Sequence, residues 1–122
     1  MTVRCRVPES HSTVSVSLIN PVNFGPAVIE RFMAPPVPGL DTFELSPSLA
    51  FLIEHSSGRK LVFDLGIRKD YTNYSASIAA YIPTTNYDIR IEKDVAGTLR
   101  DGGIALDSVN AIIWRLVGHF AA

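Results

Sequence analysis

The chain has 122 residues, 47% of them hydrophobic and 19% charged, and eleven basic against twelve acidic residues give a net charge of -1. This length allows one domain with a buried core, and the balanced charge argues against a nucleic-acid or anionic-membrane surface, which needs clustered Lys and Arg. The single Cys5 excludes an internal disulfide, and neither a secretory signal nor an apolar stretch of ~18 residues is present, so we expect a cytoplasmic protein without a membrane or nucleic-acid partner.

The first forty residues predict an arm, a strand and a loop. Residues 1–12 are polar and form the arm. Residues 13–20 alternate between apolar and polar side chains, which is the pattern of a half-buried strand with Val14, Val16 and Leu18 on one face. Because proline lacks a backbone donor, the strand should end at Asn20-Pro21, and the proline-rich residues 21–40 should form a surface loop.

The middle of the chain predicts a β-hairpin. Residues 42–45 form a short strand, and residues 48–63 contain two apolar runs, FLI and LVF, separated by the turn residues SSG. Apolar runs of this length, bounded by Gly and Ser, indicate buried strands. Asp64 follows the second run, and an acid at the end of a core strand often faces a functional site.

A helix is predicted after the hairpin, over residues 71–82, and Pro83 should stop it. Its Tyr71, Tyr74 and Tyr81 have two interpretations. They form a helix face packed on the core, or they line a substrate pocket in a larger relative.

The last third predicts a strand, a helix and a strand. Residues 88–91 form a short strand or an approach to the next helix, and residues 92–101 form a helix that ends at Gly102-Gly103. Val95 and Leu99 are spaced to face the core. Residues 108–114 read as another buried strand, and the whole pattern predicts a mixed α/β fold.

Two segments in this order, SLAFLIEHSSGRKLVFDLGIRKD and DVAGTLRDGGIALDSVNAIIW, resemble the metallo-β-lactamase fold superfamily, most closely its lactonase-like, fungal-type hydrolases. The resemblance implies the N-terminal half of an αββα sandwich, left incomplete. It divides the chain into an arm (1–12), a partial domain (13–114) and an unmatched tail (115–122).

The sequence departs from the family after Trp114. There the family pattern continues with His-x-His-x-Asp-His, whose side chains hold zinc for the hydrolysis of an ester, lactone, thioester or amide, whereas this chain reads RLVGHFAA. None of those ligands maps onto it, so we expect no catalytic residue, no metal ligand and no cofactor in this chain, and zinc in intact relatives.

The histidines lead to the same expectation without the family. A hydrolytic zinc site needs about three protein ligands and an open position. The three histidines, His11, His55 and His119, are scattered along the chain, and we interpret them as surface or partly buried residues.

Two interpretations remain open for Asp64. By resemblance it matches the family's acid beside the metal centre, which orients the ligand loop through hydrogen bonds. The residue pattern alone favours an Asp that accepts hydrogen bonds from the backbone of its own turn, with Gly66 serving the turn geometry.

Our leading hypothesis is a truncated member of a metal-dependent hydrolase family that is inactive for lack of zinc ligands. The alternative is a non-enzymatic α/β protein that binds a partner or a second copy, because missing strands leave a sheet edge and an apolar face open. A third idea is a nucleotide or small-ligand module built around the Asp64 loop.

Overall fold

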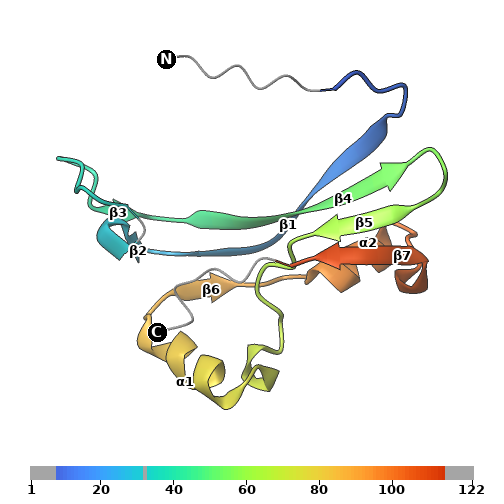
Figure 1. Cartoon of the computed structure of the whole chain (residues 1–122). Helices are drawn as coiled ribbons and strands as arrows, with labels where there is room; N and C mark the ends of the chain where they lie inside the picture. The colour runs from blue at the N-terminus through green and yellow to red at the C-terminus, as the bar shows by residue number, and fades with distance from the viewer. Residues whose placement is uncertain (1–7, 32, 115–122) are drawn as a thin grey trace.

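The structure is a computed structural model that describes residues 8–31 and 33–114. Within them one sheet has the strand order β6-β1-β4-β5-β7, and a two-stranded ribbon pairs β2 with β3 (Figure 1). The strands are β1 (Val14–Gly25), β2 (Ala27–Val28), β3 (Thr42–Phe43), β4 (Ser46–His55), β5 (Lys60–Phe63), β6 (Asp88–Arg90) and β7 (Val109–Ile113). The helices are α1 (Ala76–Thr84) and α2 (Val95–Asp101), with 3₁₀ turns at Ile29–Arg31, Tyr71–Asn73 and Leu106–Ser108. The predicted mixed α/β fold is confirmed.

The predicted hairpin is the centre of the sheet. Strands β4 and β5 pair antiparallel, with Leu52 opposite Val62 and Phe51 opposite Phe63. Gly58 has a φ of 84° in the connecting turn, a conformation that glycine adopts without strain. Strand β1 pairs antiparallel with β4 on one side, and β7 pairs parallel with β5 on the other.

One face of this sheet carries the main core. Helix α2 packs against it, and Val95 and Leu99 are buried there as predicted. The helix begins later than the sequence suggested, because Asp94 is its N-cap and accepts a hydrogen bond from the Gly97 N–H at 2.8 Å. The buried members of this cluster are Ile19, Ala50, Leu52, Val62, Val95 and Leu99.

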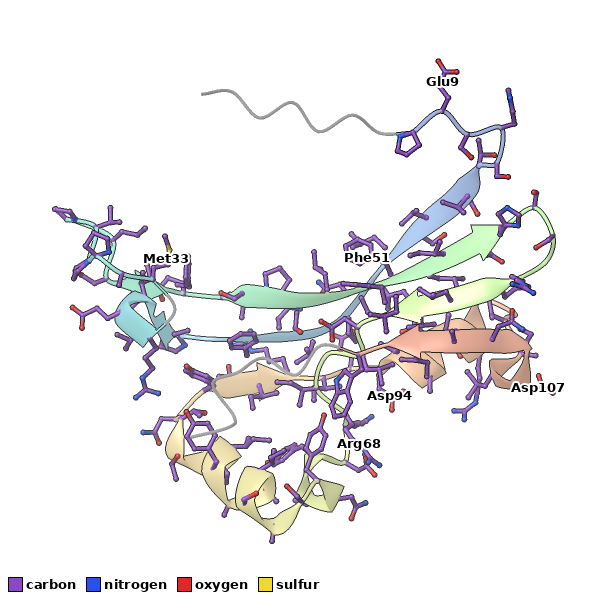
Figure 2. All side chains as sticks on the ribbon, viewed as in Figure 1. Glu9, Met33, Phe51, Arg68, Asp94 and Asp107 are labelled. Carbon is purple, nitrogen blue, oxygen red and sulfur yellow. The ribbon has the colours of Figure 1, made fainter. Side chains whose placement is uncertain are left out.

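The opposite face of the sheet, which we call the open face, carries apolar side chains that are half-buried in the middle of the sheet and exposed on β1. Val14, Val16 and Leu18 lie on it with 51%, 58% and 61% of their surface exposed. The alternation in β1 was therefore predicted correctly, but the expected burial of its apolar side is wrong for this part of the molecule. In Figure 1 α1 lies below the sheet and α2 is drawn behind β7, and Figure 2 gives the same view with the side chains.

Two proline predictions are wrong. Pro21 does not end the first strand, because β1 shifts register between Ile19 and Val22 and continues to Gly25. A bulge is one of the few places in a sheet that tolerates proline. The ribbon β2-β3 also gives the expected loop of residues 21–40 some regular structure, and the short strand predicted at 42–45 is confirmed as β3.

Pro83 lies inside α1 rather than stopping it at residue 82. The helix ends at Thr84, two residues later than predicted, and the N–H of Thr85 then donates to the Ile82 carbonyl at 3.1 Å. Pro83 lacks the N–H that would bond to the Ala79 carbonyl, so the helix loses one hydrogen bond and ends soon after it. The helix is also shorter at its start than predicted, since residues 71–73 form a separate 3₁₀ turn.

Strand β7 is present as predicted but is not buried. It is an edge strand among the described residues, and Ile112, Ile113 and the following Trp114 are about half exposed. The segment at 88–91 is confirmed as strand β6, which pairs with the far end of β1. No helix in residues 8–31 and 33–114 has the length and apolar character for crossing a membrane.

Candidate functional site

The C-terminal ends of β5 and β7 meet at Asp64. Its backbone N–H donates to the Ile113 carbonyl at 2.8 Å, so the turn after β5 and the end of β7 are joined directly. Its carboxylate Oδ1 accepts hydrogen bonds from the N–H groups of Leu65 at 2.7 Å and Gly66 at 3.2 Å. The side chain thus caps its own turn, the geometry that the residue pattern alone suggested.

Asp64 is held in an unusual conformation. Its φ is 65°, in the left-handed region, and only 8% of its surface is exposed. Asp tolerates that region better than most residues because its short carboxylate bonds to nearby backbone groups. Residues held in sparsely populated backbone conformations, such as this buried acid at the end of two parallel strands, are often found at functional sites.

Gly66 connects this turn to the bulge in β1. It has a φ of 59°, and a Cβ added there would lie 2.9 Å from Cγ of Pro21. Glycine is therefore required both for the backbone conformation and for the close approach.

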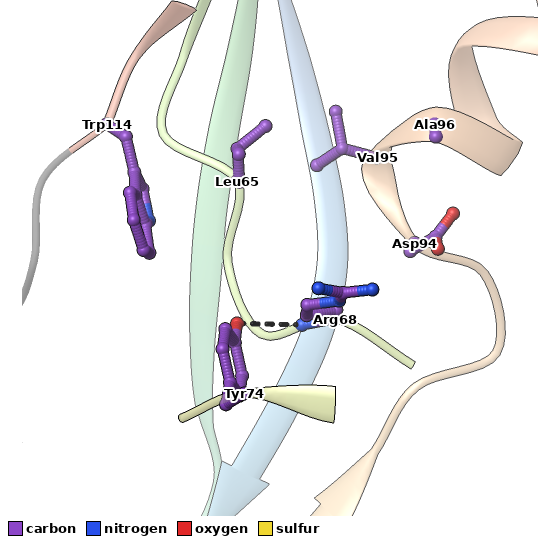
Figure 3. A pocket seen from close by; sticks show the side chains of 7 residues that line it. All are labelled: Leu65, Arg68, Tyr74, Asp94, Val95, Ala96 and Trp114. Carbon is purple, nitrogen blue, oxygen red and sulfur yellow. Dashed lines mark hydrogen bonds between the residues drawn. The ribbon is translucent and has the colours of Figure 1, made fainter. Parts of the chain in front are cut away.

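A small pocket lies beside the turn, with a volume of about 130 Å³. Figure 3 shows its walls, which come from the loop after β5, the start of α2 and the end of β7. It is mainly apolar, with one guanidinium and one carboxylate. The lining residues are Leu65, Arg68, Tyr74, Asp94, Val95, Ala96 and Trp114.

Arg68 is fixed at the mouth of this pocket. Its Nε and Nη2 each lie 2.7 Å from a carboxylate oxygen of Asp70, its backbone N–H donates to Tyr74 Oη at 3.3 Å, and its guanidinium lies 5.8 Å from the centre of the Tyr74 ring. Hydrogen bonds from Arg68 and then from Asn73 lower the pKa of Asp70 to about 2, and the same pair raises the pKa of Arg68. Both side chains are held charged in one orientation.

The sequence did not single out Arg68 or Trp114 as site residues. Of the tyrosines, Tyr74 lines the pocket, and the interpretation that the tyrosines line a substrate pocket in a larger relative stays a prediction. The available signal was the Arg-x-Asp spacing in RKD, which suits a local ion pair but does not indicate what it faces. Trp114 is separated from Leu65 by 49 positions and joins it only through the pairing of β7 with β5.

The described residues do not fit a zinc site. No group of three or more His, Cys, Asp or Glu side chains converges anywhere in residues 8–31 and 33–114. His55 Nδ1 accepts from the Ser57 N–H at 3.1 Å in the hairpin turn, and His11 is exposed near the N-terminus. His119 lies outside the described residues.

The chain is similar to known proteins over most of its length. No family model matches, and no solved structure matches. It is 40% identical to a gamma-lactamase, FDB1, of Fusarium pseudograminearum over 114 residues, which cover 88% of this chain and 27% of that protein. It is 43% identical over 54 residues to a gamma-lactamase, MBL2, of Gibberella moniliformis, covering 44% of this chain and 23% of the relative.

A third relative is a metallo-hydrolase, mfmC, of Annulohypoxylon moriforme, 29% identical over 118 residues, which cover 88% of this chain and 29% of that protein. The chain thus spans about a quarter of the length of these relatives. Two of the three matches cover 88% of this chain. These relatives, named gamma-lactamase and metallo-hydrolase, support the resemblance of this chain to a part of the metallo-β-lactamase fold.

Proposed function

We propose that this chain provides one structural part of a metal-dependent hydrolase and that it does not catalyse hydrolysis by itself. The hydrolase part is supported by relatives that are named gamma-lactamase and metallo-hydrolase. The inactivity is supported by a sequence without His-x-His-x-Asp-His and by described residues in which no potential ligand group gathers.

The observation that carries the proposal is the hydrogen bond between the Asp64 N–H and the Ile113 carbonyl. It brings the acid-containing turn to the end of β7, after which the family pattern has its ligand motif. In a full-length relative, Asp64 would support that motif through its turn, and the zinc would supply the activated water for attack on a carbonyl. Arg68, Tyr74 and Trp114 would then border the space beside the reacting group.

An exchange of segments tests the hydrolase part. The matched segment of the Fusarium gamma-lactamase is replaced by the matched residues of this chain, and γ-lactam hydrolysis is compared among the parent, the chimera and a variant with the segment deleted. We expect the chimera to hydrolyse the lactam and the deletion variant to be inactive. An insoluble chimera, or a soluble one without activity, contradicts the proposal.

The isolated chain tests the inactive part. Purified from medium supplemented with zinc, it should contain far less than one zinc ion per chain by mass spectrometry and should leave γ-lactam, lactone and thioester substrates intact. Stoichiometric zinc together with turnover contradicts this part of the proposal.

A second candidate function is a non-enzymatic interaction protein. Its support is the open face, where apolar side chains of β1 and β7 are about half exposed. Soluble monomers seldom leave an apolar patch of this kind uncovered. Size-exclusion chromatography with light scattering tests it, and a monomer with cooperative unfolding and no tendency to associate counts against it.

A further inference from the structure

The pocket beside the Asp64 turn has a size and a lining that suit one ring of a small molecule. Its volume of about 130 Å³ is close to that of an apolar cavity of about 150 Å³ that binds benzene in another protein. Figure 3 shows the aromatic side chains of Tyr74 and Trp114 and the aliphatic side chains of Leu65 and Val95 in its walls. Apolar walls with a few polar groups are typical of small-molecule sites, where the polar groups determine which molecules bind.

The cation at the mouth of this pocket is already paired. Arg68 donates hydrogen bonds to both carboxylate oxygens of Asp70 at 2.7 Å, one from Nε and one from Nη2. Asp70 also accepts a hydrogen bond from Asn73 Nδ2 at 2.9 Å, which holds the carboxylate in place. A carboxylate bound at such short distances cancels most of the field of the guanidinium. Arg68 is therefore not available as a receptor for a second anion.

The second charged group in the pocket lining, Asp94, is compensated as well. It is half-buried at the N-cap of α2, and its Oδ1 accepts a hydrogen bond from the Gly97 N–H at 2.8 Å. A carboxylate at this position is stabilised by the N–H groups and the partial positive charge of the first helical turn. Both charged groups among the described lining residues thus have a partner within the structure.

A pocket with compensated charges favours an uncharged ligand. An ion that enters such a pocket loses hydration, and the described lining residues offer it no unpaired charge of opposite sign in return. The guanidinium of Arg68 also lies 5.8 Å from the centre of the Tyr74 ring, so it takes a ring face that would attract a cationic ligand. An uncharged group loses less hydration and still gains contact with the apolar walls.

We infer that this pocket binds an uncharged, ring-sized group of the substrate and that Asp70 sets this preference by neutralising Arg68. The inference rests on the proposed function, which makes the ligand of the pocket a part of the substrate. Asp70 acts through Arg68 rather than by contact with the ligand. Removal of the Asp70 charge should therefore turn the mouth of the pocket into a site for carboxylates, since an unpaired guanidinium binds them well.

Three molecules of the same shape and different charge test the preference on the 122-residue chain. At neutral pH benzoate is an anion, benzamide is uncharged and benzamidine is a cation. The indole N–H of Trp114 reports binding in NMR titrations, because it belongs to the only tryptophan of the sequence and lines the pocket. We expect benzamide to bind about tenfold more tightly than either ion. Tighter binding of benzoate or benzamidine, or no binding of any of the three, overturns the inference.

Substitutions assign the preference to Asp70. Asp70→Asn keeps the shape of the side chain and removes its charge, so it should strengthen benzoate binding about tenfold and leave benzamide binding nearly unchanged. Arg68→Gln combined with Asp70→Asn loses the same ion pair but has no cation, and should bind benzoate as weakly as the original chain. Asp88→Asn breaks the pair with Arg90, whose Nη2 lies 2.6 Å from Asp88 Oδ2, and is the matched control.

The pattern among these variants decides between charge and loop structure. Unchanged benzoate binding in Asp70→Asn overturns the role of Asp70. An equal gain in the double variant or in Asp88→Asn also overturns it, because the gain then does not come from an unpaired Arg68. Circular dichroism of each variant should match that of the original chain.

The chimera of the segment exchange extends the test to turnover. Pyroglutamate and its amide are γ-lactams that differ in the charge of one substituent. The chimera should open the lactam ring of the amide with the higher kcat/KM, and Asp70→Asn should reduce the difference about tenfold. An active chimera that does not distinguish the two substrates leaves the hydrolase proposal intact and removes this inference. An inactive chimera removes the proposed function, and benzamide binding by the chain then separates that failure from a failure of the pocket preference.

Discussion

Leu52 on β4 and Leu18 on β1 lie on opposite sides of the same sheet, with 5% and 61% of their surface exposed. Leu52 belongs to the cluster beneath α2, whereas Leu18 belongs to the open face. Their residue type is the same, so any difference in their contribution to stability comes from what covers them.

Truncation of each leucine measures that difference. Leu52→Ala should lower the free energy of unfolding by about 2–5 kcal/mol, because it leaves a cavity in the packed cluster. Leu18→Ala in the isolated chain should cost about 0.5 kcal/mol or less, since the side chain is already hydrated. Urea unfolding monitored by circular dichroism checks both, and equal losses would show that the open face is covered in solution.

The N-cap of α2 gives a second prediction. Asp94→Ala removes the hydrogen bond to the Gly97 N–H and should destabilise the chain by about 1 kcal/mol. Asp94→Asn retains an acceptor oxygen and should cost much less. The urea unfolding midpoints of the two variants measure the stability that the cap contributes. An unchanged midpoint for the alanine variant would mean that the cap contributes nothing.

Alanine substitutions at two glycines distinguish the cost of a steric clash from the cost of backbone strain. Gly66 and Gly103 have φ values of 59° and 75°, but only at Gly66 does an added Cβ meet another group, Pro21 Cγ at 2.9 Å. Gly103→Ala should cost about 1 kcal/mol from strain alone. Gly66→Ala should cost measurably more in thermal unfolding, and a smaller loss than at Gly103 would contradict the tight approach between the Asp64 turn and β1.

The Arg68–Asp70 pair predicts a pH dependence. The folded-state pKa of Asp70, about 2, lies below its ordinary 3.8, so its stabilising effect is complete above about pH 4 and is lost as the pH falls toward 2. Both side chains are half exposed, so the effect on stability is small. The titration is best followed at the carboxyl carbon by NMR. Arg68→Gln should move the Asp70 midpoint toward 3.8, and Arg90→Gln, whose partner is Asp88, should leave it unchanged.

The local pattern of the sequence was sufficient for most elements of the fold. The hairpin, α2 with Val95 and Leu99, and β7 were predicted from residues close in sequence and are present, although α2 begins later than predicted. The expectations for Pro21 and Pro83 were wrong because a proline shows only that a backbone donor is missing. A bulge accommodates Pro21, and α1 continues for one residue beyond Pro83.

The candidate site was harder to predict from local sequence patterns than the strands and helices were. Asp64 was identified from its place after an apolar run, but Arg68, Tyr74 and Trp114 meet only through the crossover that brings β7 beside β5. Alternation in β1 likewise separates two sides of a strand without indicating which side another layer will cover. These properties depend on contacts between distant parts of the chain.

The parallel pairing of β5 with β7 also bears on the order of assembly. Leu61 and Ala111 are partners although 50 positions separate them, whereas β4 and β5 are joined by a four-residue turn. Contacts between distant positions form more slowly than local ones, because a long loop must close first. The antiparallel hairpin should therefore gain amide-exchange protection early in refolding, and the Asp64 amide should gain it only when the last strand arrives.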